Sequence, residues 1–179
     1  MYDDNPYSAR AWLLDEIARD FKTGGSYSVS ASKSTNAAFL KWTGHTFGSL
    51  QTKWKTKPAY TTCADFLFHT NRMLCDKNSV RAGARFGFVP FGLDQCGANG
   101  FGWHTIGDDG PYSGDYFQQG SDGSTTHVGI IAEINGTMAT YLAGGGGTPG
   151  SSQSITMVQG EWPPENLLGW LDIDEYYNP

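Results

Sequence analysis

The stretch HVGIIAEINGTMATYLA, residues 127–143, decides the fold class. Apolar and small or polar residues alternate along 127–134, which predicts a strand with its Val128 side in the core. The dipeptide Asn135-Gly136 follows, and Asn-Gly between two apolar segments is the strongest short-range signal for a β-hairpin. We therefore expect an antiparallel hairpin here, with Asn135 and Gly136 as its two turn residues.

A two-residue turn at that place determines which residues face each other across the hairpin. Ile131 is expected to face Thr140, and His127 is expected to face Gly144. Gly129 lies on the same side of the strand as His127 and has no side chain. It should leave room for a helix terminus or a substrate to approach the imidazole.

The hairpin is one part of a longer run of strands. Further strands are expected at 115–118, 154–158 and 168–173, whereas residues 144–147 and the following Thr-Pro-Gly-Ser-Ser indicate a flexible connector. The earlier residues have helical periodicity instead. Helices are expected at 7–22, 34–43 and 62–76, with a loop from 44 through 58 and a long irregular excursion at 80–112. Helices first and strands after predict an α+β fold, with the third helix packed on one face of an antiparallel sheet.

The composition is that of a globular domain. The chain has 179 residues, a net charge of -6, 39% hydrophobic and 17% charged residues. A chain of this length can bury a hydrophobic core without metals or disulfides, so we expect one domain over 1–179. Within it we expect a mainly helical part at 1–60 and a catalytic core at 61–179. Lys and Arg form no cluster, which argues against a nucleic-acid partner.

No apolar run approaches the ~18 residues that span a bilayer, and the first residues, MYDDNPYSAR, lack the basic and apolar regions of a secretory signal. We therefore expect synthesis in the cytoplasm without a Sec signal, and no membrane span. Cys63, Cys75 and Cys96 are an odd number at wide spacing, which argues against a disulfide framework. A zinc site at Cys63, His69 and Cys75 is not expected either, because a step of six residues turns a helix by about 240°. We expect no metal and no cofactor.

Cys63 is the first candidate for chemistry. Thr62 can cap the third expected helix, and Asp65 completes a capping box with it, which makes Cys63 the first helical residue. The N–H groups and the positive end of the helix dipole favour a thiolate at that position. A small buried core cysteine is the alternative.

His127 is the second candidate, because it opens the strand of the hairpin. A histidine there can act as the general base for a thiol, or it can be a structural residue bonded at a strand end. Asp115 comes after a glycine at a strand entrance, where a carboxylate most often bonds its own turn.

In this order and spacing the chain resembles the NlpC/P60 and CHAP type of papain-like cell-wall amidases. The resemblance lies in TTCADF at the start of a helix, then SGDYF, then THVGII leading into a hairpin, and it covers roughly residues 61–143. Typical members of the family read D-C-S-G-[FL] or G-Q-C-T around the nucleophile, and this chain reads T-C-A-D-F. The first sixty residues resemble no family that we can name.

The resemblance implies a papain-like cysteine hydrolase in which Cys63 attacks an amide carbonyl and His127 transfers the proton. It implies peptidoglycan peptides as substrate, with the protein acting at the bacterial wall or periplasm as a phage lysin or as a secreted antibacterial effector such as a type VI amidase toxin. An effector would pair with an immunity protein. The alternatives are an acyltransferase or deamidase on the same two residues, or a non-catalytic, aromatic-rich wall-binding module.

The family also carries a polar third residue that orients the histidine. The expected hairpin register brings no ionisable group close to His127, so a main-chain carbonyl near 143–145, Thr140 after a register shift, Gln153, Asp172 or Asp174 could take this role. His104, Trp103 and Asp115 are candidates for the lining of the cleft.

Overall fold

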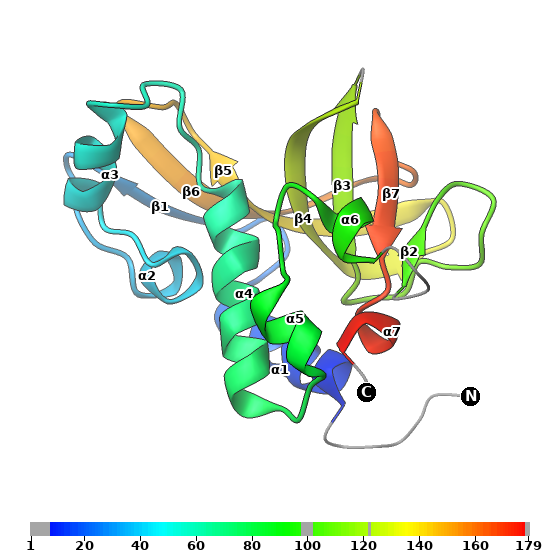
Figure 1. Cartoon of the computed structure of the whole chain (residues 1–179). Helices are drawn as coiled ribbons and strands as arrows, with labels where there is room; N and C mark the ends of the chain where they lie inside the picture. The colour runs from blue at the N-terminus through cyan, green and yellow to red at the C-terminus, as the bar shows by residue number, and fades with distance from the viewer. Residues whose placement is uncertain (1–7, 98–101, 122, 178–179) are drawn as a thin grey trace.

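A seven-stranded sheet runs through the protein, and helices pack against it (Figure 1). The computed structural model describes residues 8–97, 102–121 and 123–177. The strand order is β1-β6-β5-β4-β3-β7-β2, and every neighbouring pair is antiparallel. The strands are β1 (Ser26–Ser30), β2 (Trp103–His104), β3 (Tyr116–Ser121), β4 (Ser124–Asn135), β5 (Met138–Gly146), β6 (Ser152–Glu161) and β7 (Leu167–Leu171). The α+β prediction is confirmed at this level.

The helices lie mostly in the first half of the chain. They are α1 (Ala9–Asp20), α2 (Ala37–Thr43), α3 (Phe47–Trp54), α4 (Cys63–Lys77), α5 (Ala82–Phe86), α6 (Leu93–Cys96) and α7 (Ile173–Tyr177). The helices expected at 7–22, 34–43 and 62–76 correspond to α1, α2 and α4, although residue 7 lies outside the described residues. Gly44, at φ 74°, ends α2 in the left-handed conformation, as its position predicts.

The loop expected through residue 58 is wrong, because α3 lies within it. Thr46 caps this helix in a capping box with Ser49, and Phe47, Leu50 and Trp54 form its buried side. Their spacing of three and four is helical, so the signal was present in the sequence. The irregular excursion at 80–112 likewise contains the short elements α5, α6 and β2.

The hairpin of β4 and β5 forms, but the predicted register is wrong. Asn135 pairs with Met138, so Gly136 and Thr137 are the turn residues. Gly136 has φ 61° at the first turn position, which is the one place where a type II′ turn needs a positive φ. Asn135 therefore stays in the strand, and the register moves by two residues.

A β-bulge changes this register again farther along the hairpin. The pairing shifts between Ile131 and Glu133, so that Ile131 faces Tyr141 and not Thr140. Ile130 then faces Leu142, the last pair of the ladder. The predicted connector at 144–147 is also wrong in part, because β5 continues through Gly146.

Both faces of the sheet are buried. On the face that α4 covers, Val128 and Ile130 belong to one cluster with Phe66 of α4. Ile131 points to the opposite face and belongs to a second, smaller cluster with Phe117 of β3. The Val128 side is core as predicted, but the other side is core as well.

The mainly helical first third also contributes a strand. The short edge strand β1 pairs with β6, so residues 26–30 belong to the same sheet as the strands of the second half. Only one of its residues, Val29, is fully buried, which explains why its sequence shows no clear strand pattern. In the part of the chain that the structure describes, no helix combines the length and apolar character needed to cross a membrane.

The packing of α4 gives a stability test with a matched control. Phe66 is fully buried and stacks on Trp42 at 5.8 Å, whereas Phe68 on the same helix is 43% exposed. We expect Phe66→Ala to lower the free energy of unfolding by about 3–5 kcal/mol and Phe68→Ala by less than about 1 kcal/mol. Urea denaturation measures both, and equal losses would contradict the described packing.

Candidate active site

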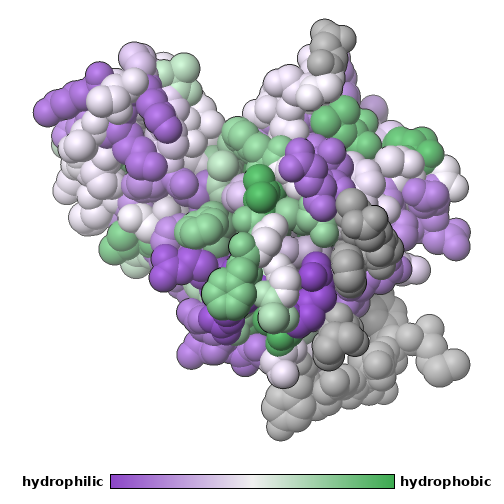
Figure 2. Space-filling model, viewed as in Figure 1, coloured by the Kyte–Doolittle hydropathy of each residue, from purple (hydrophilic) through white to green (hydrophobic). Residues whose placement is uncertain are grey.

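Cys63 is the first residue of α4, a helix of 15 residues. In Figure 1 this end of α4 lies between the half of the molecule with α2, α3, β1 and β6 and the half with β3, β4 and β7. Figure 2 shows that the surface is hollowed between these two halves. The Cys63 residue itself is only 1% exposed, and its sulfur lies 3.6 Å from the Thr61 hydroxyl.

Thr62 does not form the predicted capping box. No side-chain cap bond is made by this residue; its backbone N–H instead donates to Gln153 Oε1 at 3.0 Å. The Thr62 hydroxyl donates to the same oxygen at 3.4 Å and accepts from the N–H of Gly145 at 3.0 Å. Thr62 and Gln153 are both fully buried, so this network fixes the start of α4 against β5 and β6.

Two glycines of β5 allow this close approach. A Cβ on Gly144 would lie 2.8 Å from the Thr62 carbonyl oxygen and 3.0 Å from Phe66 Cβ. A Cβ on Gly145 would lie 3.3 Å from Cys63 Cβ, and Gly145 has φ 89°. A larger residue at either position would push the start of α4 away from the sheet.

Gly129 has a different role from the one predicted. A Cβ there would lie 2.7 Å from the ring of Phe117 and 2.8 Å from Ala143 Cβ. Phe117 is directly opposite Gly129 in the β3–β4 ladder, and its ring occupies the free space. The room beside Gly129 is therefore filled by an aromatic core residue and not by a helix terminus.

His127 lies on β4, opposite Gln119 of β3. The last residue pair of the β4–β5 ladder is Ile130 with Leu142. A Cβ on Gly129 would lie next to Ala143, so these two residues are also neighbours across the two strands. Beyond that point the pairing of β5 with β6 shifts between Ala143 and Gly146, so the register opposite His127 does not follow from the ladder. Gly145, which packs on Cys63, belongs to β5, and His127 belongs to the neighbouring strand β4.

The imidazole of His127 is partly buried and has no charged neighbour that shifts its pKa. Its ring packs on Phe117, with the ring centroids 5.8 Å apart. Burial lowers the pKa of His127 and so favours the neutral imidazole. Among the described residues, no hydrogen bond joins His127 to Cys63 Sγ or to a residue that would orient the ring.

The residues considered for the orienting role lie elsewhere. Thr140 pairs with Glu133, six residues from His127 along β4, a distance of about 20 Å at 3.3 Å per residue. Asp172 and Asp174 bind Arg10, at 3.0 and 2.5 Å. Gln153 binds Thr62, so it positions the cysteine helix and not the histidine.

Asp115 belongs to the same cluster around Arg10. It is fully buried and accepts from Arg10 at 2.8 Å and from the N–H of Tyr112 at 2.8 Å. The bond to Tyr112 closes its own turn, as expected for a carboxylate at a strand entrance. Burial raises the pKa of Asp115 to about 7 in spite of the opposing Arg10 charge. Asp115 is thus buried and is not among the residues that line the cleft beside Trp103. Its partner Arg10 was missed in the sequence, although Arg10 precedes the buried Leu13 by one helical turn.

The other two candidates for the cleft lie on β2. Trp103 lines an open cleft of about 490 Å³. The cleft is also lined by Phe91, Asp94, Gln95, Gln118, Gly123, Ser124, Thr125 and Leu168. Thr125 is on β4, two residues before His127, so the cleft reaches the strand that carries the candidate base. His104 stacks on Trp170 and faces α7.

No family model, no curated protein and no solved structure matches this chain. The resemblance of residues 61–143 to the NlpC/P60 and CHAP type therefore stays a prediction. The assignment of chemistry depends on the positions of Cys63, Gly145 and His127 in the fold.

Gln153 gives the first test of this site. Gln153→Leu leaves the buried N–H of Thr62 without an acceptor, which should lower the free energy of unfolding by about 1–3 kcal/mol. Gln159→Leu, on the same strand but exposed, should change it by less than about 0.5 kcal/mol. Urea denaturation compares the two, and an unperturbed Gln153→Leu would show that the network does not hold the helix.

The burial of His127 gives a second test. Its lowered pKa means that the histidine contributes stability above the ordinary pKa of about 6.5, and that this contribution is lost as the pH falls through the folded-state pKa. We expect an NMR titration midpoint below 6.5 for His127 in the folded protein. A midpoint at or above 6.5 would reveal a negatively charged partner and would contradict the described environment.

Proposed function

We propose that this protein is a papain-like cysteine hydrolase that cleaves amide bonds in peptidoglycan peptides, with Cys63 as nucleophile and His127 as base. One observation carries the proposal. Cys63 starts a long helix and packs on Gly145 of β5, and β5 pairs with β4, the strand that carries His127. The sequence resemblance supplies the substrate class.

The chemistry follows from the two side chains. The Cys63 sulfur attacks the amide carbonyl carbon, and His127, having taken the thiol proton, returns it to the leaving amine. The thioester that remains is opened by water, whose proton passes to His127 and then to the departing Cys63 thiolate. We infer that the N–H of Cys63, at the start of α4, donates to the oxyanion once the substrate reaches this buried residue.

We infer that an extended peptide binds in the cleft beside Trp103, which Thr125 of β4 also lines; Cys63 and His127 themselves are not among its lining residues. Its lining combines aromatic and aliphatic side chains with the polar side chains of Asp94, Gln95 and Gln118. This mixture suits a substrate with alternating methyl and amide groups. Phe91 is 43% exposed at its edge, which leaves apolar surface for contact with the substrate.

A non-catalytic wall-binding module is the rival function. The burial of Cys63 and the missing hydrogen bond to His127 favour it. An acyltransferase or deamidase would use the same residues but would differ in its acceptor. Isolated peptidoglycan separates these possibilities, because cleavage releases new amino groups, whereas binding alone does not.

We expect the wild-type protein to release amino groups from peptidoglycan, and Cys63→Ala and His127→Ala to lower the rate at least a hundredfold with wall binding retained. Cys96→Ser and His69→Gln are matched controls that should keep the rate. Burial raises the pKa of Cys96, so it is a poor nucleophile, and His69 lies six residues beyond Cys63 on α4. Binding without release in the wild type would favour the wall-binding module. Release that survives Cys63→Ala would refute the proposed nucleophile, and a product formed only with an added amine would favour the acyltransferase.

A further inference from the structure

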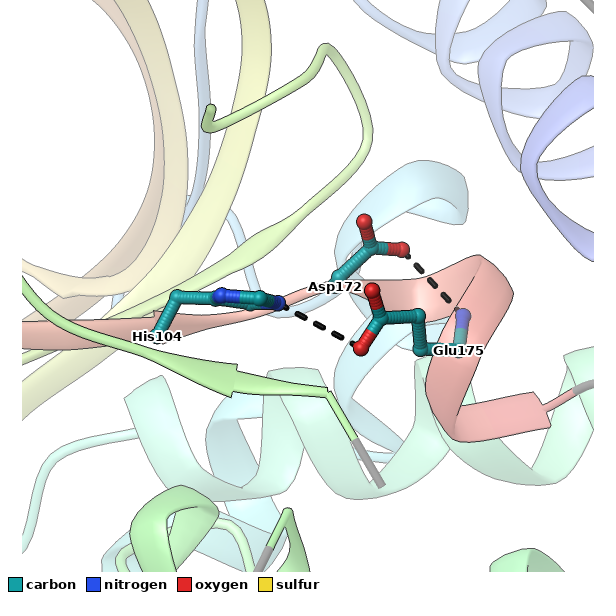
Figure 3. Close-up of side chains that lie close together, drawn as sticks. All are labelled: His104, Asp172 and Glu175. Atoms are coloured by element: carbon teal, nitrogen blue, oxygen red, sulfur yellow. Dashed lines mark hydrogen bonds and ion pairs between the residues drawn. The ribbon is translucent and has the colours of Figure 1, made fainter. Parts of the chain in front are cut away.

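A second group of side chains lies apart from Cys63 and His127, where β2 and α7 meet. His104, Asp172 and Glu175 each offer one ligand atom, and these atoms all lie within 4.8 Å of one another. Figure 3 shows the ring edge of His104 directed at the carboxylate of Glu175, with Asp172 beside them. His104 Nε2 lies 3.4 Å from Glu175 Oε2.

The backbone fixes this arrangement from both sides. His104 pairs with Trp170 across β2 and β7, and its ring stacks on the indole with an interplanar angle of 18°. Asp172 Oδ1 accepts the N–H groups of Asp174 and Glu175, at 2.9 and 3.2 Å, which fixes its carboxylate at the start of α7. The ring and one carboxylate are therefore in place without a ligand.

Gly102 keeps the two elements close together. Its carbonyl accepts the N–H of Asp172 at 2.8 Å. A Cβ at this position would lie 2.9 Å from Glu175 Cβ, and Gly102 has φ 94°. Only glycine suits this conformation and this approach, so the contact between the segment before His104 and α7 is specified by the sequence.

The local charge provides an independent argument for a cation. Arg10 binds Asp115, Asp172 and Asp174, so a single guanidinium faces three carboxylates. Glu175 adds a fourth carboxylate, whose ion-pair partner in the described part of the chain is His104. Asp174 Oδ1 is buried and has no hydrogen-bond partner among the described residues. The carboxylates of Asp115, Asp172 and Asp174 thus share one guanidinium, that of Arg10.

We propose that His104, Asp172 and Glu175 bind a divalent transition metal ion such as Zn²⁺. One imidazole and two carboxylates are a known ligand set for this class, and a water molecule completes four-coordination. Metal–ligand distances of about 2.0–2.2 Å bring ligand atoms to about 3.3 Å from one another. Glu175, whose side chain is 52% exposed, has the freedom to close this gap.

The proposed ligands come from β2 (His104) and from the start of α7 (Asp172 and Glu175). A bound ion would connect these two elements and should therefore stabilise the fold. This inference does not depend on the proposed function, because none of the three residues contacts Cys63 or His127. Zinc, after removal of metals with a chelator, is the probe. We expect one Zn²⁺ per chain by equilibrium dialysis and a rise in Tm of roughly 4 °C or more.

Variants connect that effect to the three residues. Glu175→Gln and His104→Phe should weaken zinc binding at least tenfold and remove the rise in Tm. His104→Phe keeps an aromatic ring on Trp170, so it separates loss of the ligand from loss of packing. The matched controls His69→Ala and Glu165→Gln should bind zinc as the wild type does.

Cysteine ligation is the main competing source of zinc binding. Replacing zinc by Co²⁺ separates the two, because a thiolate ligand gives a charge-transfer band and a site of nitrogen and oxygen does not. The proposal is overturned if the wild type binds no zinc, if the cobalt complex shows thiolate ligation, or if Glu175→Gln and His104→Phe bind zinc with unchanged affinity. A preference for Ca²⁺ over Zn²⁺ would overturn the assigned metal class.

Discussion

The packing of the first turn of α4 on Gly144 and Gly145 of β5 is the contact on which the arrangement of the protein depends. Both glycines are in contact with the helix start, so no side chain fits between the two elements. The hydrogen bonds from Thr62 to Gln153 and from Gly145 to Thr62 then satisfy polar groups that this contact removes from water. A cysteine placed at that helix start is necessarily close to the middle of the sheet, and its burial follows from the same contact.

The Arg10 cluster gives a second constraint, which joins distant parts of the chain. Arg10 lies on α1, Asp115 stands at the entrance to β3, and Asp172 and Asp174 flank the start of α7. A buried guanidinium needs anionic partners, and here they come from segments more than a hundred residues away. The first helix is thereby attached to the last one, whereas α4 is attached to the central strands. The carboxylates that family resemblance suggests as helpers of His127 are occupied by this structural role.

Sequence patterns predicted most of the elements, because apolar periodicity and glycine stops are local properties. Helices α1, α2 and α4 and the strands β3 to β7 follow from them, and so does the α+β class. The register of the hairpin did not follow, because it depends on which residue takes the positive φ of the turn and on a bulge at Ala132 that no local pattern marks. The glycines at 144–145 looked like a flexible connector, since a close contact with a helix eighty residues earlier is invisible to local composition. The grouping of His104 with Glu175 was hidden for the same reason.

The two histidines of the second half show how neighbours decide what one residue type can do. His127 is packed against Phe117 and burial alone lowers its pKa, so the neutral imidazole with a free lone pair is favoured. A proton acceptor for a thiol needs that form, and under the proposed function the helix terminus at Cys63 would supply the stabilisation that a carboxylate supplies in a full triad. His104 is stacked on Trp170, and its Nε2 lies 3.4 Å from the carboxylate of Glu175. The two histidines thus differ in their surroundings: His127 packs on an aromatic core residue, whereas His104 lies beside the carboxylates of Asp172 and Glu175.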